Sequence, residues 1–352
     1  MHCFVCRLEY SKKIFMIYDK FKILFFSLLI SSSFSQNEVC LEVVANPHAS
    51  DPALSLFTKY VNVLDCFHIY AEPSISDYKV LHVASVAAEL LDNDENGEVD
   101  DPLLKQELSY RDALIPIITS EWSSAANNFF NNYNGDGASA VLFNNEIDPG
   151  NPGHWGDDAT VEEVVHVIND IGHVSIYPDA FDLEPNSSLM SAAMDVARGG
   201  QFINIPSQYP DEAWYHYDDW TCDYQCMAIE YMYWCIVSNM GILDDPQTCN
   251  GIDNEWELCT PDLFESTDIS MHQILTDPIY KLPQLAPDGN YCPSSGSVGD
   301  LNLDGIVNVL DVILIVNMVL GLEPGIGYAD INSDGTINIL DVIQIVNIIL
   351  NN

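Results

Sequence analysis

Two stretches near the C-terminus decide how the last part of this chain folds. The first, DLNLDGIVNVLD, covers residues 300–311, and the second, DINSDGTINILD, covers residues 330–341. The similarity continues past both stretches: residues 300–320 align with residues 330–350 without gaps, and 13 of the 21 positions are identical. Self-similarity at a fixed offset indicates a duplicated structural unit.

Each stretch has the residue pattern of a calcium-binding loop. Oxygen-bearing side chains occupy loop positions 1, 3, 5, 9 and 12, a backbone carbonyl is available at position 7, and glycine at position 6 permits the sharp turn. The predicted calcium ligands are Asp300, Asn302, Asp304, Ile306, Asn308 and Asp311 in the first loop, and Asp330, Asn332, Asp334, Thr336, Asn338 and Asp341 in the second. Because an apolar helical segment follows each loop, we expect a small all-α unit of two calcium loop–helix repeats.

No amphipathic helix precedes the first loop, and in this the unit resembles the type I dockerin domain over residues 298–352. The resemblance implies calcium-dependent docking to a cohesin-like protein. It implies partner-binding residues at loop positions 10 and 11 and on the following helix, which here are Val309, Leu310, Val316, Asn317, Ile339, Leu340, Val346 and Asn347. This apolar set differs from the Ser-Thr and Lys-Arg pairs of many dockerins, so the identity of the partner stays open. A calcium-stabilised pair of helices without a partner is the alternative interpretation.

The first residues have the pattern of a secretory signal peptide. Two lysines precede the apolar run of residues 23–30, and small residues before Gln36 suggest a cleavage site. The run is too short to span a bilayer comfortably, although a membrane anchor is the alternative. Met16 fits as the true first residue, in which case residues 1–15 would not belong to the protein. We predict a signal peptide at 1–35, a catalytic or binding module at 36–293, a linker at 294–297 and the dockerin at 298–352.

Composition excludes some functions and favours others. The chain has 352 residues, of which 48% are apolar, so it can form a sizeable core. Fifty-three acidic residues against 11 basic ones give a net charge of −42, which repels nucleic acid and suits divalent cations. We expect a secreted or extracellular protein, held at a cell surface only through its partner. We expect no nucleic-acid binding and, once the signal peptide is removed, no membrane span.

Cysteine usage agrees with export. Eight of the ten cysteines follow residue 35: Cys40, Cys66, Cys222, Cys226, Cys235, Cys249, Cys259 and Cys292. An even number in an exported chain predicts up to four disulfides, with no more than one thiol left free. The pairing cannot be read from the spacing. A cysteine–metal site is the less favoured alternative, because paired CxxC units are missing.

The module before the linker has a mixed pattern. Residues 113–119 and 138–143 are predicted strands, and the segment 122–133 between them is a predicted helix. Further helices are predicted at 80–91, 160–171, 188–198 and 223–240. This order predicts an α+β module that is richer in helix in its second half.

A third acidic loop follows the first predicted helix. It offers calcium ligands at positions 1, 3, 5, 7 and 9, which are Asp92, Asp94, Asn96, Glu98 and Asp100. Position 12 is Leu103, so Asp101 or Glu107 would have to supply the last ligand. We predict calcium binding here, with a solvated acidic turn as the alternative.

The predicted helix at 160–171 carries the most chemistry. At about 100° per residue, Glu162, His166 and, if the helix reaches it, His173 fall on one side, opposite an apolar stripe. A carboxylate and two imidazoles on one face are a candidate zinc site. The alternative is structural: Thr160 and Glu163 have the spacing of a capping box, which would make the helix an ordinary one with polar residues on its surface.

The same segment resembles the HExxH helix of zincin metallopeptidases, with Glu162 in the place of the first histidine. The resemblance implies that Glu163 is the general base and His166 a zinc ligand. Glu230, on the later apolar helix, would be a further ligand, since a buried carboxylate needs a partner and the chain after residue 35 has six basic residues.

These features predict a zinc-dependent, peptidase-like hydrolase that acts on a substrate protein. Two alternatives stay open. The first is a module that degrades or binds polysaccharide, which the aromatic and acidic residues 214–220 would suit. The second is a non-catalytic surface adhesin.

Overall fold

The computed structural model describes residues 41–292, 299, 301, 307–322, 329, 331–332 and 336–351. The predicted signal peptide and linker therefore lie outside the described residues. The strands are β1 (Val44–Ala45), β2 (Lys59–Val63), β3 (Phe67–Ala71), β4 (Leu114–Ile118) and β5 (Leu142–Phe143). The first helices, with a 3-10 turn η2 and a π-helical segment η3, are α1 (Asp77–Leu91), α2 (Pro102–Arg111), α3 (Ser124–Asn132), η2 (Asn144–Glu146), α4 (Thr160–Val167), η3 (Ile168–His173) and α5 (Val174–Ile176). They are followed by α6 (Pro178–Phe181), α7 (Leu189–Ala197), α8 (Tyr224–Asn239), α9 (Pro246–Ile252), α10 (Pro261–Thr267), α11 (Ile269–Leu275), α12 (Val309–Val319) and α13 (Ile339–Asn351).

The strands form one mixed sheet in the order β1-β2-β3-β4-β5. β1, β2 and β3 are antiparallel neighbours, whereas β3, β4 and β5 run parallel. The parallel step from β3 to β4 needs a crossover, and α1 and α2 provide it. The fold is therefore α+β, as predicted, although its first two helices lie between strands rather than after them.

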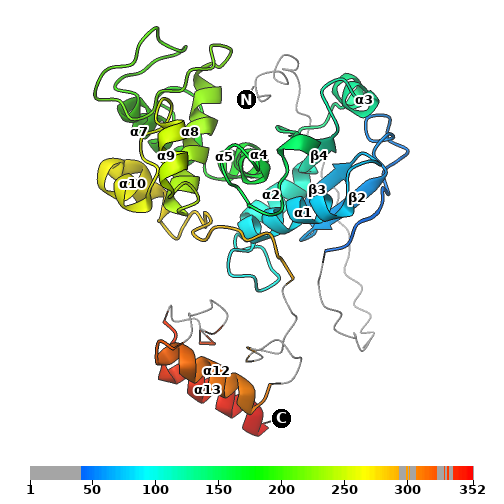
Figure 1. Cartoon of the computed structure of the whole chain (residues 1–352), viewed down its shortest axis with the longest axis vertical. Helices are drawn as coiled ribbons and strands as arrows, with labels where there is room; N and C mark the ends of the chain where they lie inside the picture. Colours follow the sequence, from blue (N-terminus) through cyan, green and yellow to red (C-terminus); the bar gives the residue numbers. More distant parts are fainter. Residues whose placement is uncertain are drawn as a thin grey trace, which may run out of the picture.

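Alternation along the strands creates two cores, one on each face of the sheet. In β3, Phe67 and Ile69 join the larger core, which α1, α4 and α8 complete, while Tyr70 joins a smaller core with α3. Figure 1 shows α4 and α5 between the sheet and α8, and α4 contacts both α1 and α8. The segment predicted to carry the chemistry thus lies where the two halves of the module meet.

Most predicted elements are present with shifted ends. The strand predicted at 138–143 is reduced to Leu142–Phe143, because only these two residues pair with β4. The helix predicted at 160–171 changes to π geometry at Ile168 and continues through His173 into α5. The sequence reading missed β1–β3, α2, α6 and α9–α11. No helix among the described residues is both long and apolar enough to cross a membrane.

Candidate functional site

The start of α4 is fixed by a buried carboxylate rather than by a capping box. The N-cap is Ala159, and Thr160 is already helical. The Thr160 hydroxyl donates to Oδ1 of Asp158 at 2.6 Å, and Gly153 N and His82 Nε2 lie 2.8 and 3.0 Å from Oδ2. Burial alone would raise the pKa of Asp158, but these hydrogen bonds lower it below its ordinary value. The capping-box interpretation is therefore wrong, and Glu163 is not needed at the helix start.

His166 of α4 meets two side chains of α8, Glu230 and Tyr233. His166 is 2% exposed, and its Nε2 lies 3.4 Å from Oε2 of Glu230, which is 4% exposed. Nδ1 of His166 lies 4.0 Å from Oε2 of Glu163. The ring of Tyr233 stands edge-on to the imidazole, with centroids 5.6 Å apart. The predicted contact between α4 and α8 therefore exists, and it is almost fully shielded from solvent.

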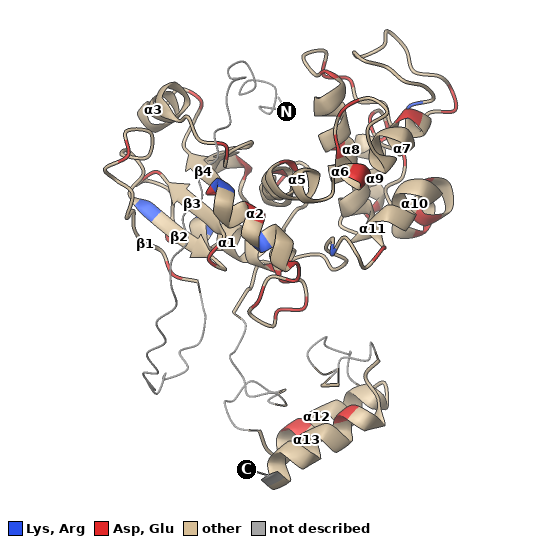
Figure 2. Cartoon of the chain, turned by 180° about the vertical axis from the view of Figure 1, so that it is seen from behind, with Lys and Arg blue, Asp and Glu red and all other residues tan. Residues whose placement is uncertain are grey.

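Glu163, His166 and Glu230 line a cavity of about 390 Å³. Its acidic lining residues are Glu121, Glu146, Glu162, Glu163, Asp218, Asp219, Glu230 and Glu255. Its remaining lining residues are Val141, Phe143, Trp155, Gly156, Ala159, His166, Tyr217 and Trp234. None of these lining residues is Lys or Arg. Figure 2 shows basic positions on β2, α1 and α2, and two further ones, Arg198 at the end of α7 and Lys281 after α11; neither of these lines the cavity. The cavity is therefore strongly acidic, with one imidazole.

The crowding of carboxyl groups changes their protonation. Burial and then the charge of Glu230 raise the pKa of Glu162 to about 7, and burial and Glu162 raise the pKa of Glu163 well above its ordinary value. Burial lowers the pKa of His166, but Glu230, Glu163 and Glu162 together outweigh this effect and raise it to about 9. Burial raises the pKa of Glu255 to about 7. A bound cation would relieve this repulsion.

His173 does not join the other candidate ligands. It stays on the helical segment, but η3 adds about one residue per turn, which rotates His173 away from the face of His166. Its Nδ1 lies 2.8 Å from Oδ1 of Asn169, and its ring lies beside Phe181. Burial lowers the pKa of His173 to about 4. The helical segment reaches His173, but His173 does not line the cavity that holds His166 and Glu230.

Some cavity residues were missed by the sequence reading. Glu121, Glu146 and Glu255 lie in loops or at the end of a short 3-10 turn, where no periodicity marks a common face. Glu255 is next in sequence to Trp256, which is fully buried. A neighbouring tryptophan is the one feature of the sequence that indicates Glu255 lies near the core. Within segment 214–220, Asp218 and Asp219 reach the cavity, whereas Nε2 of His216 is 2.9 Å from the carbonyl of Ala213.

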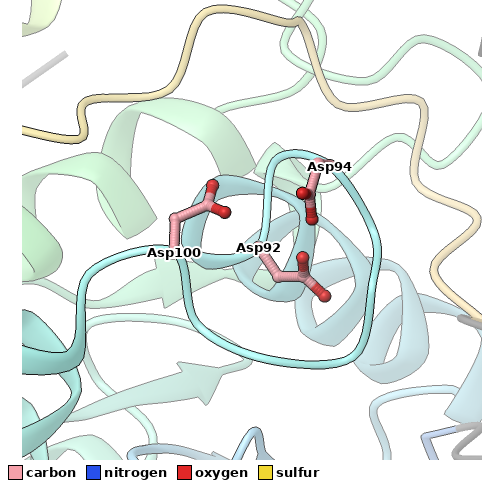
Figure 3. Close-up of side chains that lie close together, drawn as sticks. All are labelled: Asp92, Asp94 and Asp100. Atoms are coloured by element: carbon pink, nitrogen blue, oxygen red, sulfur yellow. The ribbon is translucent and has the colours of Figure 1, made fainter. Parts of the chain in front are cut away.

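Three carboxylates of the third acidic loop lie close together. Asp92, Asp94 and Asp100 each place a carboxylate oxygen within 4.8 Å of the others, and no other set of three His, Cys, Asp or Glu in the described part of the chain does so. Figure 3 shows these three side chains on the loop. Oδ2 of Asp92 accepts hydrogen bonds from Gly97 N at 2.7 Å and from the Tyr291 hydroxyl at 2.5 Å. Burial raises the pKa of Asp92 to about 6.

The other residues considered as ligands of this loop differ in their hydrogen-bond and ion-pair partners. Asn96 and Glu98 are in the loop, and Oδ1 of Asn96 accepts from Glu98 N at 2.9 Å. Asp101 caps α2 by accepting from Leu103 N and also accepts from the Tyr177 hydroxyl. Glu107 pairs with Arg111 at 2.9 Å. Neither Asp101 nor Glu107 therefore takes the empty twelfth position.

The cysteines form fewer disulfides than the maximum predicted. Cys222 is bonded to Cys226 and Cys249 to Cys259, and Cys292 is also disulfide-bonded. Cys66 and Cys235 are free and buried, so the expectation of at most one free thiol is wrong. Both thiols lie in the larger core, where each behaves as a small apolar side chain. Cys40 lies outside the described residues.

The C-terminal repeats are described in their helical parts. α12 and α13 pack together over Ile315, Val342 and Ile345. Asp311 and Asp341, at loop position 12, are fully buried and accept hydrogen bonds from Asn308 N at 2.7 Å and Asn338 N at 2.8 Å. Asn332 and Thr336 are also described. The other predicted loop ligands, Asp300, Asn302, Asp304, Ile306, Asp330 and Asp334, lie outside the described residues.

The predicted partner-binding residues lie mainly on the outside of the helix pair. Val309, Leu310, Ile339 and Leu340 are between 52% and 64% exposed, Val346 is 36% exposed, and Asn347 is also exposed. Val316 and Asn317 are half-buried. Exposed apolar side chains at equivalent positions of both repeats are typical of a protein-binding face.

Comparison with known proteins agrees with this arrangement. The family model for the dockerin type I domain matches residues 298–350. No curated protein and no solved structure matches the chain. The duplicated loops, the helix pair and the family match lead to one conclusion: the C-terminal part of this chain is a type I dockerin domain.

Proposed function

We propose that this chain is an exported protein that docks to a cohesin-like partner and carries a separate functional module. In this proposal residues 1–35 are removed on export, residues 36–293 form the module, residues 294–297 are the linker and residues 298–352 form the calcium-dependent docking domain. The family match at residues 298–350 supports docking. An extracellular location follows from such docking, with the chain held at a cell surface through its partner.

We further propose that the module is a zinc-dependent, peptidase-like hydrolase. The observation that carries this proposal is the meeting of Glu162, Glu163 and His166 with Glu230 in one buried cavity whose wall holds no basic residue. The acidic lining residues face one imidazole and no Lys or Arg, so a divalent metal ion would compensate charge that His166 alone does not. Nε2 of His166 is buried 3.4 Å from Oε2 of Glu230, and a metal ion bound by both groups would replace the proton between them.

Each residue has a distinct role in this proposal. Glu162, His166 and Glu230 would hold the zinc ion. His166 and Glu230 already lie 3.4 Å apart, but the three ligand atoms do not all lie within 4.8 Å of one another, so the set would have to draw together. Zinc supplies Lewis acidity toward a carbonyl and lowers the pKa of water. Glu163 lines the same cavity and would accept the proton of the attacking water.

Metal analysis combined with hydrolysis of a fluorescent casein substrate tests this proposal. Glu163→Gln should keep one zinc ion per chain and lose hydrolysis, because the amide cannot accept the proton. His166→Ala should lose both zinc and hydrolysis. His216→Ala is the matched control, since its imidazole contacts the carbonyl of Ala213, and it should retain both. A wild-type chain that binds no zinc contradicts the proposal.

A second candidate function is supported by exposed tryptophans. Trp122 is 83% exposed and Trp220 is 85% exposed, and they adjoin the cavity-lining residues Glu121 and Asp219. Indole rings this exposed are rare and are typical of binding surfaces. A polysaccharide-degrading or polysaccharide-binding module, or an adhesin, would use such rings. Retention of zinc-free protein on insoluble glycans distinguishes this function from the peptidase.

We also propose that the loop from Asp92 to Leu103 binds calcium as a structural ion of the module. The carboxylates of Asp92, Asp94 and Asp100 converge there, and Asn96 and Glu98 occupy further ligand positions of the loop pattern. The Tyr291 hydroxyl donates a hydrogen bond to Asp92, 199 residues earlier in the sequence. An ion that orders Asp92 would therefore also stabilise the position of Tyr291 at the end of the module.

A further inference from the structure

The acidic cavity has more carboxyl groups than the proposed zinc chemistry uses. Three of its eight acidic lining residues are the proposed zinc ligands Glu162 and Glu230 and the proposed base Glu163. The other five come from the loop after β4, the turn after β5 and two loops of the helical half, and they are Glu121, Glu146, Asp218, Asp219 and Glu255. A divalent ion supplies only two positive charges, so most of the lining stays uncompensated even when zinc is bound.

One of these five carboxyl groups is held in place by the wall of the cavity. Oε1 of Glu255 accepts a hydrogen bond from Nε1 of Trp234 at 3.3 Å. Trp234 in turn stacks on the buried ring of Trp256, with centroids 6.3 Å apart. Besides burial, the charges of Glu230 and Asp218 raise the pKa of Glu255, so these carboxyl groups lie near one another. Glu255 and Asp218 therefore form an acidic wall beside the proposed zinc site.

Aromatic rings line the same cavity as these carboxyl groups. The aromatic lining residues are Phe143, Trp155, Tyr217 and Trp234. The position of Tyr217 is fixed, because its carbonyl accepts a hydrogen bond from the Tyr209 hydroxyl at 2.6 Å. Carboxylates beside aromatic rings suit a long cationic side chain, since its methylene stem packs against the rings while its head group pairs with a carboxylate. The lining thus matches the two parts of a lysine or arginine side chain.

Desolvation favours a cationic ligand over a neutral or anionic one. A polypeptide that enters the cavity displaces water from the carboxylates. A neutral segment would leave these carboxylates desolvated and unpaired, which is costly, and an acidic segment would add repulsion. A lysine or arginine head group replaces the lost water with a charge-assisted hydrogen bond. Tyr217 and Trp234 are only 6% and 5% exposed, which leaves room for a methylene stem but little open ring surface for a sugar.

We propose that the acidic cavity selects polypeptide substrates that carry a lysine or arginine next to the bond that is cut. Asp218 and Glu255 pair with the cationic head group, and Tyr217 and Trp234 pack against its stem. This inference rests on the proposed peptidase function and names its substrate class. Asp218 and Glu255 act on substrate binding and not on the zinc ion, so their effect is measurable separately from metal content.

Capped peptides that differ only in one central residue test this proposal. That residue is lysine, arginine, norleucine or glutamate, so the peptides carry one charge of either sign or none. Binding is measured by titration calorimetry with the full secreted chain carrying Glu163→Gln, and kcat/KM is measured with the wild type. We expect the lysine and arginine peptides to bind and react about tenfold better than the norleucine peptide. Asp218→Asn/Glu255→Gln should remove most of this preference and keep zinc, because the amides retain size but not charge.

The matched control is Asp211→Asn/Glu212→Gln, which removes two charges at exposed positions that do not line the cavity. This control should keep the preference for lysine. The proposal is overturned if norleucine and lysine peptides bind alike, if both double variants reduce the preference equally, or if a chitosan hexamer binds more tightly than the lysine peptide.

The two proposals for this cavity fail in different ways. Hydrolysis of the lysine, norleucine and glutamate peptides with equal kcat/KM would overturn the substrate preference and leave the peptidase proposal intact. A chain that holds no zinc and cleaves no peptide, yet binds the lysine peptide through Asp218 and Glu255, would overturn the peptidase proposal and support the recognition of a cationic side chain.

Discussion

Glu89 is a buried carboxyl group with half of its hydrogen-bonding capacity unused. It lies on α1 and is 3% exposed; Oε2 accepts from Gly289 N at 3.0 Å, while Oε1 has no partner among the described residues. Burial raises its pKa from 4.5 to about 7. Between these two pH values the folded state keeps a proton that the unfolded state has released, so the free energy of unfolding falls as pH rises.

Glu89→Gln should remove this pH dependence. At pH 4 both proteins carry a neutral side chain, and their stabilities should be similar. Above pH 7 the variant should have gained about 3 kcal/mol relative to the wild type, since each pKa unit corresponds to about 1.4 kcal/mol. Urea unfolding of both proteins at pH 4, 5.5 and 8 measures the difference. A difference that does not change with pH would show that Glu89 ionises normally in the folded protein.

Single residues also show what the sequence could and could not predict. The partnership of Glu230 with His166 was predictable, because an acidic residue on an apolar helix needs a partner and basic residues are few. The position of His173 was not, since a π segment leaves no periodic mark in the sequence. Glu255 reaches the cavity from a loop, where spacing carries no information about direction.

At the scale of elements, local patterns predicted long helices better than short strands. α1, α7 and α8 begin and end within a few residues of their predicted bounds, because caps and apolar runs mark them. β2 and β3 were missed although they form the centre of the sheet with β4. β2 begins with Lys59, and Asn62 of β2 and His68 of β3 are polar. The apolar run of each strand is therefore short.

The acidic loop after α1 gives a prediction about one element. If it binds calcium, equilibrium dialysis should find three calcium ions per chain, two in the dockerin loops and one here. Asp94→Ala should reduce the number to two and lower the melting temperature in calcium, because the loop ends at Asp101, which caps α2. In EDTA the variant and the wild type should melt alike. Asp262→Ala, at an exposed position of α10, is the control and should keep three ions. Two calcium ions in the wild type would contradict the prediction.

At the scale of the whole molecule, the duplication in the dockerin domain has a consequence for docking. The two repeats place equivalent residues 30 positions apart, and Leu310 and Leu340 are 53% and 52% exposed. Each repeat therefore presents its own apolar face, and the two faces are chemically similar. The two repeated helices and their equivalent positions were predictable from sequence because the unit is duplicated, whereas the cavity of the N-terminal module depends on side chains that only folding brings together.

We expect the two faces to substitute for each other in binding. Leu310→Asp and Leu340→Asp, taken singly, should each leave binding to a cohesin domain within a few-fold of the wild type, because the other face is intact. The double variant should lose binding, since a charge then replaces the central apolar contact on both faces. Titration against purified cohesin domains in millimolar calcium measures this, and circular dichroism in calcium establishes that the variant helices still form. If only one of the two single variants loses binding, then only one repeat contacts the partner. The similarity of the two repeats would then serve calcium-dependent folding rather than recognition.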